Sequence, residues 1–168
     1  MAYFNKFPKL YYPTGNTKTL VPDIFRRVHM DKFFANRTNL TGYYVSDGMT
    51  PELVSQDMYG STEYHWLVLL TNEIIDIARE WPKSQEELIL YVKDKYGANN
   101  SSDIHHYVLT ADKSIVVDWD AVKAVDGTYT ALTNLQYEEE VNDKKRQIKV
   151  LNPLFLSAVT KQFNRLMK

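Results

Sequence analysis

The sequence predicts a small α+β protein in which helices and short strands share one chain of 168 residues. Two capping boxes, at residues 84–87 (Ser-Gln-Glu-Glu) and 133–136 (Thr-Asn-Leu-Gln), mark helix starts, because their side chains can satisfy exposed backbone amides reciprocally. Two short apolar runs, 107–109 and 115–117, flank the turn at 111–113, which is typical of a β-hairpin. The length suits one domain of ordinary size, or a small domain with appendages.

Residues 1–40 are predicted to form an N-terminal arm and linker. Pro8, Pro13, Gly15 and Pro22 interrupt any periodicity, which favours an extended arm. An arm this apolar should lie on the body of the protein or on a partner, and the sequence leaves both alternatives open. Residues 23–34 are compatible with a strand or a short helix. The hypothesis of partner binding concerns the five aromatic residues Tyr3, Phe4, Phe7, Tyr11 and Tyr12.

Residues 41–97 are predicted to form a strand-helix-helix module with a following helix. Residues 43–45 are typical of a short strand, and Thr50 and Pro51 are suited to the N-cap and first position of a helix that ends at Gly60. A second helix, from residue 61 or 62 to Asn72, is apolar nearly all round and must be covered on most sides. The third helix begins at the capping box of residues 84–87 and ends at Gly97.

Residues 98–168 are predicted to form a region of a hairpin and helices. The helix after Thr133 has acidic residues at 138–140 and basic residues at 144–146, an order that matches the helix dipole and predicts a solvated helix, with a binding patch as the alternative. A brief strand at 148–151 precedes a last helix capped by Asn152. We expect its apolar stripe to pack on the hairpin of residues 107–117, with a neighbouring subunit as the alternative.

Composition excludes several classes of function. Lys and Arg total 20 against 21 Asp and Glu, so the chain lacks the clustered basic charge on which binding of nucleic acid or anionic lipid depends. There is no Cys, which excludes disulfides, thiolate zinc sites and a cysteine nucleophile. No export signal or apolar run of about 20 residues is present, so we expect neither secretion nor a membrane span. Twelve Tyr residues suit surfaces that become buried in an assembly.

Few residues could support chemistry. His105 and His106 follow Asp103, but adjacent side chains of a strand point to opposite faces, so a shared metal ion is not expected. Asp118 and Asp120 would share a strand face about 7 Å apart, a spacing that admits paired-carboxylate hydrolysis, although Asp beside a hairpin is more often turn chemistry. We find no nucleophile elbow, phosphate loop or zinc-protease motif. The sequence therefore predicts no catalytic residue, no metal and no cofactor.

Residues 44–55 (Tyr-Val-Ser-Asp-Gly-Met-Thr-Pro-Glu-Leu-Val-Ser), with Met-Tyr-Gly at 58–60 and Leu-Leu-Thr-Asn at 69–72, resemble the LysM module. That family has a strand, a Gly-Asp-Thr-like turn, two short helices and an Asn before a returning strand. The resemblance implies a LysM-like module in this part of the chain.

Further landmarks extend the resemblance over nearly the whole chain. They are Phe7-Pro8, residues 23–27 (Asp-Ile-Phe-Arg-Arg), Tyr59-Gly60, His65-Trp66, Glu80-Trp81-Pro82, Lys95-Tyr96-Gly97, His105-His106-Tyr107, and Tyr137-Glu138 leading to Asn142 and Lys145-Arg146. In this order they are similar to the LysM-like baseplate wedge subunits of contractile-tailed bacteriophages. The resemblance implies a late, structural virion protein of the tail baseplate, assembled in the host cytoplasm, without catalysis. It also implies that the chain joins wedge subunits and helps neighbouring wedges to close around the central hub.

The resemblance also carries an alternative, a peptidoglycan-binding LysM accessory protein of a tail-like device. In glycan-binding LysM modules the sugar lies in a groove between the first strand-to-helix loop and the loop after the second helix. Here residues 76–81 replace the usual returning strand with its Gly and Pro landmarks, which argues against glycan binding. The groove positions implied by the resemblance are Asp47, Gly48, Met49, Thr50, Asn72 and Ile74.

Overall fold

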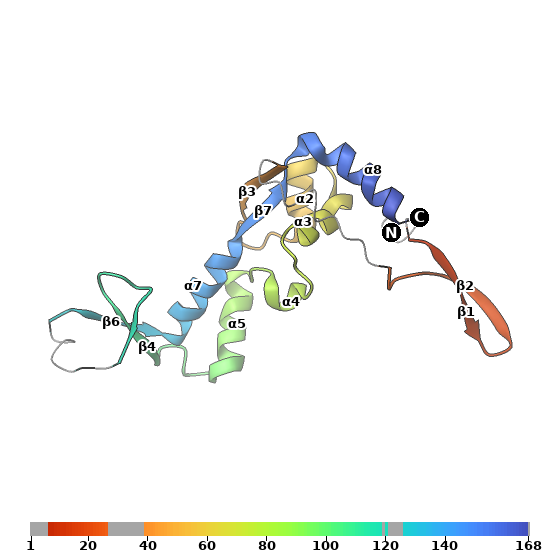
Figure 1. Cartoon of the computed structure of the whole chain (residues 1–168). Coiled ribbons are helices and arrows are strands. Elements are labelled where there is room, and N and C mark those ends of the chain that lie inside the picture. Colours follow the sequence, from red (N-terminus) through yellow and green to blue (C-terminus); the bar gives the residue numbers. More distant parts are fainter. Residues whose placement is uncertain (1–6, 27–38, 119, 121–125, 168) are drawn as a thin grey trace. The chain divides into compact units, whose positions relative to one another are not determined.

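Helices and short strands both occur along the chain in the computed structural model, which confirms the mixture of α and β structure (Figure 1). The structure describes residues 7–26, 39–118, 120 and 126–167. Contacts divide them into two units: unit 1 holds the described residues of Met1–Tyr43, Met49–Ile75 and Ile148–Lys168, and unit 2 those of Tyr44–Gly48 and Asp76–Gln147. Each unit thus combines segments that are far apart in the sequence, whereas the sequence suggests three consecutive regions.

Unit 1 begins with an antiparallel hairpin of β1 (Lys9–Thr14) and β2 (Thr17–Pro22). Gly15 lies in the turn with a φ of 60°, in the left-handed region that glycine enters without steric cost. The arm predicted from the sequence is therefore extended, but its two halves pair with each other. Most of the segment 23–34, which the sequence leaves as strand or helix, lies outside the described residues.

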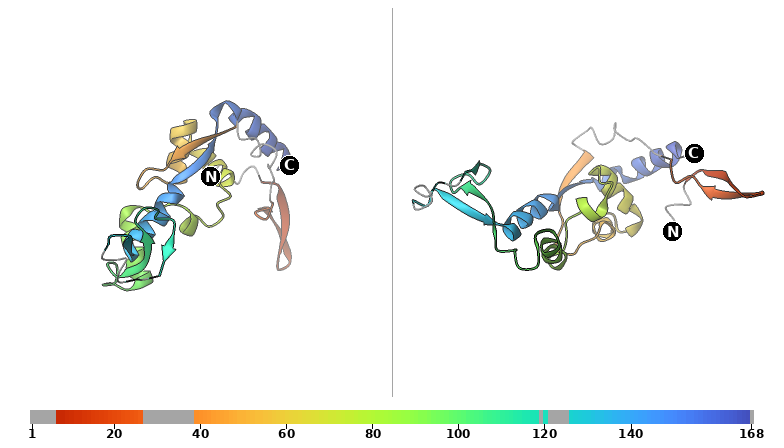
Figure 2. Two further views of the ribbon diagram at one scale, coloured as in Figure 1. Left: turned by 60° about the vertical axis from the view of Figure 1, so that its left-hand side comes forward. Right: turned by 90° about the horizontal axis from the view of Figure 1, so that it is seen from below.

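The next elements of unit 1 follow the order strand, helix, helix, strand. They are β3 (Leu40–Tyr44), α2 (Pro51–Tyr59), the 3-10 helix η3 (Thr62–Tyr64) running into α3 (His65–Thr71), and β7 (Gln147–Leu151). β3 and β7 form a two-stranded sheet, seen as neighbouring orange and blue arrows in Figure 2. The returning strand thus comes after residue 146 rather than directly after the second helix.

Two backbone hydrogen bonds fix the direction of this sheet. The amide of Asn152 donates to the carbonyl of Asn39 at 2.8 Å, and the amide of Val45 donates to the carbonyl of Arg146 at 2.9 Å. Because the partners run backward from 152 to 146 as the chain advances from 39 to 45, the two strands are antiparallel.

The helix ends predicted in unit 1 are confirmed by their caps. The hydroxyl of Thr50 accepts a hydrogen bond from the amide of Leu53, Pro51 is the first residue of α2, and Gly60 ends it with a φ of 71°. Ser61 caps η3 in the same way as Thr50 caps α2, and α3 ends at the C-cap Asn72. Local side-chain chemistry therefore sets these boundaries.

The core of unit 1 is built around α3 and the C-terminal helix α8 (Leu156–Leu166), which follows the 3-10 turn at Pro153–Phe155. The rings of Trp66 and Phe163 stack with centroids 4.2 Å apart. The prediction that this last helix covers the hairpin of residues 107–117 is wrong, because its apolar stripe is already buried in this core. The buried members of the cluster are Phe7, Trp66, Leu67, Leu151, Val159, Phe163 and Met167.

Unit 2 contains three helices and a three-stranded sheet among its described residues. The helices are α4 (Ile77–Glu80), α5 (Gln85–Tyr96) and α7 (Asn134–Arg146), and α5 and α7 pack against each other (Figure 1). Both capping boxes predicted from the sequence are present, at Ser84 and Thr133.

The sheet of unit 2 has the order β5-β4-β6, with both pairs antiparallel. Its strands are β4 (Ile104–Leu109), β5 (Val116–Val117) and β6 (Tyr129–Thr133). The predicted hairpin is therefore confirmed. A third strand, β6, pairs along the other edge of β4, so the C-terminal helix is not needed to complete the sheet.

Helix α7 is not the solvated helix that its charge order predicts. Glu138, Asn142 and Arg146 are all buried, and their spacing of four residues puts them on one face of the helix. Asn142 accepts a hydrogen bond from the amide of Lys83 at 2.8 Å and donates to the carbonyl of the same residue at 2.9 Å. The basic residues lie in the last turn as the dipole prefers, but the first turn holds no acidic residue, and one stripe of polar side chains is buried in unit 2 beside its apolar residues.

Candidate functional site

The β1–β2 hairpin is held to the body of unit 1 at both ends. Phe7, just before β1, is buried in the core cluster. Arg26, just after β2, donates a hydrogen bond to the carbonyl of Leu166 in the last turn of α8 at 3.0 Å, where a cation also complements the helix dipole. The amide of Asp23 donates to the carbonyl of Pro8 at 2.7 Å and closes the base of the hairpin.

Between these anchors the hairpin is open to solvent on both faces. Ten of its twelve strand residues are exposed. Tyr11 and Leu20 are register partners on one face, with 69% and 49% of their surfaces exposed, and Tyr12 is 60% exposed on the other face. Cross-strand partners lie side by side, so Tyr11 and Leu20 form one continuous exposed apolar surface on one face of the hairpin.

The five aromatic residues predicted to bind a partner thus have different surroundings. Phe7 packs in the core of unit 1, the alternative that the sequence left open, whereas Tyr11 and Tyr12 are available to a partner. Tyr3 and Phe4 lie outside the described residues.

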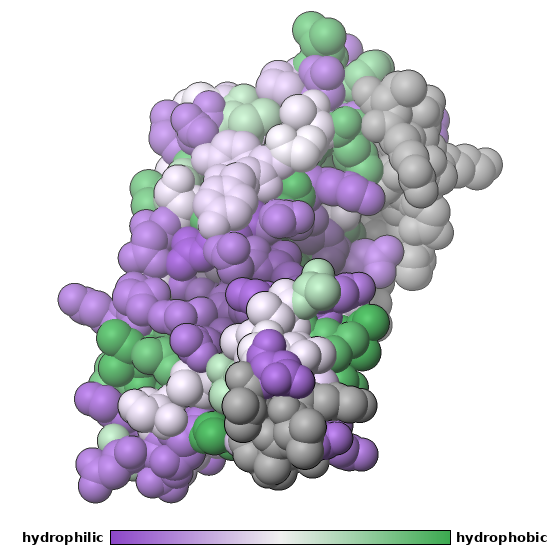
Figure 3. Space-filling view, turned by 90° about the vertical axis from the view of Figure 1, so that its left-hand side faces the viewer, coloured by the Kyte–Doolittle hydropathy of each residue, from purple (hydrophilic) through white to green (hydrophobic). Residues whose placement is uncertain are grey.

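Other large apolar side chains are also exposed among the described residues, for example Phe25, Leu90 and Leu154. On the face drawn in Figure 3, hydrophobic residues form small separate groups among hydrophilic ones. Scattered apolar residues of this kind are normal on protein surfaces and do not mark a site by themselves. No helix in the described part of the chain has the length and apolar character needed to cross a membrane.

Most residues at the glycan-groove positions implied by the LysM resemblance use their polar groups in hydrogen bonds within the protein. In unit 2, Asp47 accepts from Arg146 at 2.7 Å and from the amide of Gln85 at 3.1 Å. In unit 1, Asn72 accepts from the amide of Lys149 and donates to the carbonyls of Val68 and Lys149.

The remaining groove positions also have local structural roles. The hydroxyl of Thr50 caps α2, and the sulfur of Met49 accepts a hydrogen bond from Tyr43 at 3.7 Å. Gly48 has a φ of 70°, and the amide of Ile74 donates to the carbonyl of Leu69 at 3.0 Å. These groups stabilise turns and helix ends, which is a sufficient reason for their presence.

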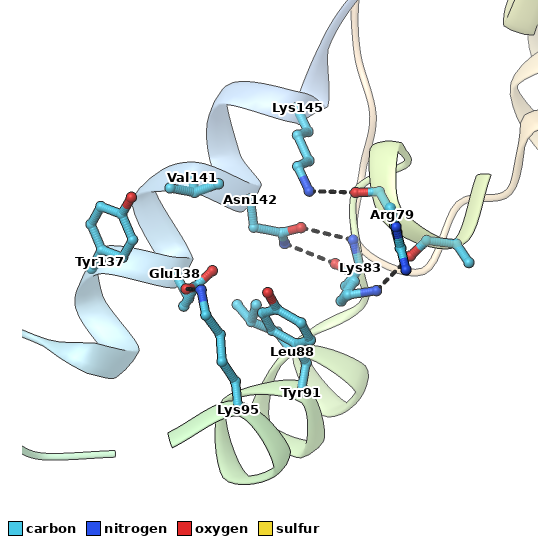
Figure 4. A pocket seen from close by; sticks show the side chains of 11 residues that line it. Arg79, Lys83, Leu88, Tyr91, Lys95, Tyr137, Glu138, Val141, Asn142 and Lys145 are labelled. Carbon is cyan, nitrogen blue, oxygen red and sulfur yellow. Dashed lines mark hydrogen bonds and ion pairs between the residues drawn. The ribbon is translucent and has the colours of Figure 1, made fainter. Parts of the chain in front are cut away.

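A pocket of about 320 Å³ lies between α4, α5 and α7 within unit 2 (Figure 4). Four of its lining side chains are cationic and one is acidic. Leu88, Tyr91 and Val141 supply an apolar part of the wall. The complete lining is Ala78, Arg79, Lys83, Leu88, Tyr91, Lys95, Tyr137, Glu138, Val141, Asn142 and Lys145.

The single carboxylate of the pocket is engaged by its neighbours. Glu138 accepts hydrogen bonds from the ammonium of Lys95 at 2.6 Å and from the hydroxyl of Tyr96 at 2.7 Å. Burial raises the pKa of Glu138, but these two hydrogen bonds outweigh burial and lower the pKa overall, while the hydrogen bond to Glu138 raises the pKa of Lys95. The pair therefore stays charged at neutral pH.

Two ammonium groups of the pocket bind to backbone carbonyls. Lys83 donates to the carbonyl of Ala78 at 2.7 Å, and Lys145 donates to the carbonyl of Arg79 at 2.6 Å. The ring of Tyr91 lies beside both Lys83 and Lys95, with the nitrogens 5.3 and 5.7 Å from its centroid. Lys83 and Lys145 thus cap carbonyls in the last turn of α4, and their charges stay at the pocket.

His105 and His106 are closer together than an ideal strand allows. The register of β4 against β6 shifts between Ile104 and His106, which is a bulge that breaks the alternation of faces. The Nδ1 atoms of the two rings are 2.7 Å apart, and His105 stacks on Tyr137 with centroids 4.0 Å apart. The expectation that these rings diverge is therefore wrong. The described residues hold no group of three metal-binding side chains around them.

Because of this histidine pair, we expect the free energy of unfolding to fall at acid pH. Burial and then the neighbouring His106 lower the pKa of His105 below its ordinary value of 6.5. The unfolded chain therefore binds this proton first, so stability should fall as pH drops through about 6.5. We expect His105→Gln to reduce the loss of stability between pH 7.5 and pH 5.5, measured by urea unfolding at both pH values. An identical loss in the wild type and the variant would contradict this assignment.

Asp118 and Asp120 do not share a strand face. Strand β5 ends at Val117, so both carboxylates lie beyond it. The strand spacing on which the idea of paired-carboxylate chemistry depended is therefore wrong.

The pocket was not predicted from the sequence. Its residues come from three segments, at 78–83, 88–95 and 137–145. The available signal is helical spacing: residues 88, 91 and 95 share one face of α5, and residues 138, 141 and 145 share one face of α7. This spacing indicates which side chains lie together on each helix, but not which two helices pack together.

The comparison with protein families finds one match. The family model described as base plate wedge protein 53 matches residues 3–118, well over half of the chain. None of the curated proteins matches this chain.

Proposed function

Because the chain belongs to the base plate wedge protein 53 family, we propose that it joins wedge subunits of a phage tail baseplate and helps neighbouring wedges to close around the central hub. The family places the chain among structural baseplate proteins that interact with other baseplate proteins. The finer role in joining and closing wedges is our proposal, with assembly in the host cytoplasm before the tail is complete.

The observation that carries this proposal is the anchored but uncovered β1–β2 hairpin. A two-stranded hairpin is marginally stable in water unless something covers it. Here Phe7 and Arg26 tie both ends to unit 1, while Tyr11, Tyr12 and Leu20 stay exposed. Such a hairpin suits a permanent contact, because Tyr gives a large apolar surface with a polar tip.

The strand order of unit 1 supports the idea of a LysM-like module. β3, α2, α3 and β7 follow the order strand, helix, helix, strand, with the two strands antiparallel. In this proposal the segment 76–146 is inserted between the second helix and the returning strand. The insertion accounts for the missing strand landmarks at residues 76–81.

Glycan binding receives no support from the arrangement. Asp47 and Asn72 already use their polar atoms on internal partners. We therefore keep the structural role and expect no retention of the purified protein on isolated peptidoglycan. Retention that chitin oligomers compete away would favour the alternative of a glycan-binding accessory protein.

A paired substitution on the hairpin tests the proposal. Tyr11→Thr with Leu20→Thr removes the exposed apolar pair and puts a β-branched residue, which favours strands, at both positions. We expect the melting temperature of the isolated protein to change little, since exposed side chains contribute within about 0.5 kcal/mol. We expect incorporation into baseplates, measured by sedimentation and quantitative blotting, to fall at least about tenfold, equivalent to a loss of roughly 1.4 kcal/mol in binding.

The matched control is Leu154→Thr, which changes an apolar residue of unit 1 that is 85% exposed outside the hairpin. It should be incorporated like the wild type. Normal incorporation of the hairpin variant would show that the hairpin does not join the chain to its neighbours.

A further inference from the structure

The pocket of unit 2 carries more positive charge than its own residues neutralise. It holds Arg79, Lys83, Lys95 and Lys145 against the single carboxylate of Glu138. Glu138 is paired with Lys95, and Arg79 lies 3.5 Å from Asp76. Among the described residues, Lys83 and Lys145 have no carboxylate within ion-pair distance.

After capping α4, the ammonium groups of Lys83 and Lys145 still have unused N–H donors. Each donates one hydrogen bond to a backbone carbonyl, at 2.7 Å from Lys83 and 2.6 Å from Lys145, whereas an ammonium has three N–H donors. Burial, and then the charge of Lys83, lowers the pKa of Lys145; attraction by Glu138 and Glu80 offsets only part of this effect, so the two lysines still repel each other at the pocket. An anion between them would relieve this repulsion and accept the remaining donors.

The rest of the wall restricts the kind of anion. Leu88, Tyr91 and Val141 present apolar surface beside the ammonium groups, which suits a carboxylate on an aliphatic stem. A volume of about 320 Å³ is at the low end of ligand pockets, which span roughly 300–1,000 Å³, so it fits one side chain better than a polymer. The carboxylate of Glu138 on the same wall disfavours a phosphate dianion, which carries more negative charge than a carboxylate.

We propose that this pocket binds the carboxylate of an acidic side chain of a partner protein, held between Lys83 and Lys145 with its stem against Leu88 and Tyr91 (Figure 4). That the partner is another baseplate subunit rests on the proposed function, but the chemistry of the pocket does not. The site lies within unit 2 and is separate from the hairpin of unit 1.

The probe is the blocked pentapeptide acetyl-Gly-Leu-Glu-Leu-Gly-amide, added to the ¹⁵N-labelled full chain and followed by amide chemical shifts. We expect saturable shifts centred on residues 78–95 and 137–146, at millimolar peptide, that weaken as salt is raised. The peptide with Gln in place of Glu has the same shape without the charge. It should bind at least about tenfold more weakly, the change that corresponds to one lost charged contact.

Charge-removing variants locate the binding. Lys83→Met and Lys145→Met keep the length of the side chain, and each should weaken binding of the acidic peptide about tenfold. Lys144→Met is the matched control, because residue 144 is the exposed neighbour on α7 and does not line the pocket. Should Lys145→Met fail to fold, judged by a collapsed amide spectrum, Lys83→Met with the control decides the question.

Three results would overturn the proposal. They are equal binding of the Gln peptide, wild-type affinity in the Lys83→Met variant, and the absence of saturable shifts up to about 10 mM peptide. Tighter binding of inorganic phosphate than of the acidic peptide at the same residues would replace the carboxylate site by a phosphate site. Because the assay uses the isolated full chain, its outcome is independent of whether the hairpin variants enter baseplates.

Discussion

Replacing Trp66 by alanine is expected to lower the free energy of unfolding by about 3–5 kcal/mol, the range for truncating a large buried aromatic residue. Trp66 is only 6% exposed and stacks on Phe163 at the centre of unit 1. Its loss would leave a cavity between α3 and α8 that the surrounding side chains fill only in part. Since small proteins have a total stability of about 5–15 kcal/mol, the variant should be close to unfolding at 37 °C.

Urea unfolding followed by circular dichroism measures this effect. The control is Leu154→Ala, a truncation in the same unit at a residue that is 85% exposed. Its unfolding midpoint should stay near that of the wild type. A midpoint for Trp66→Ala within the error of the Leu154→Ala value would show that α3 and α8 do not form the core described above.

Replacing Arg146 by methionine is expected to destabilise the protein by roughly 3 kcal/mol, because each buried hydrogen bond from a charged donor contributes about 1.5–3 kcal/mol. The guanidinium donates to the carbonyls of Val45 and Lys83, at 3.1 and 3.2 Å, and to Asp47 at 2.7 Å. Methionine keeps the packing of the stem but removes the donor to the buried carbonyl of Val45, whereas the carbonyl of Lys83 keeps its hydrogen bond from Asn142. Asp47 is 58% exposed at its side chain and returns to water at little cost.

The neighbouring Lys144→Met substitution removes the same charge from an exposed position of α7. It should change stability by no more than about 0.5 kcal/mol. Equal effects of the two substitutions would indicate that α7 is the solvated helix predicted from its charge order. A larger effect at Arg146 would confirm the buried polar stripe.

Local features of the fold could be predicted from the sequence because they depend on neighbouring residues. Thr50, Ser84 and Thr133 each cap a helix, as their spacing predicts, and Gly60 ends α2. The β1–β2 hairpin was predicted only as an extended arm. Its signal was the Gly15-Asn16 pair between two β-forming runs, which the prolines of that segment obscured.

Features that depend on which elements pack together could not be predicted. The apolar stripe of α8 predicts that one face of the helix is buried, but not which element covers it. In the structure that face packs on Trp66 rather than on the β4–β5 hairpin. The basic last turn of α7 complements the dipole whether or not one face of the helix is buried. Glu138 and Arg146 are buried because they pair with Lys95 and Asp47, which are distant in the sequence, so their burial could not be predicted from α7 alone.

The same limit applies to the candidate sites. Tyr11 and Tyr12 could be proposed as contact residues from composition, but the burial of Phe7 required the core to be known. The basic pocket joins Lys83 to Lys145 across more than sixty residues of sequence. No pattern within either segment predicts that the two lysines line the same pocket.

We propose that the β1–β2 hairpin holds this chain in the baseplate wedge. Electron cryomicroscopy of the assembled baseplate tests it most directly. We expect Tyr11 and Leu20, which are exposed in the isolated chain, to be buried against another wedge subunit. A baseplate in which this hairpin is surrounded by solvent, while the chain is held through other surfaces, would contradict the account.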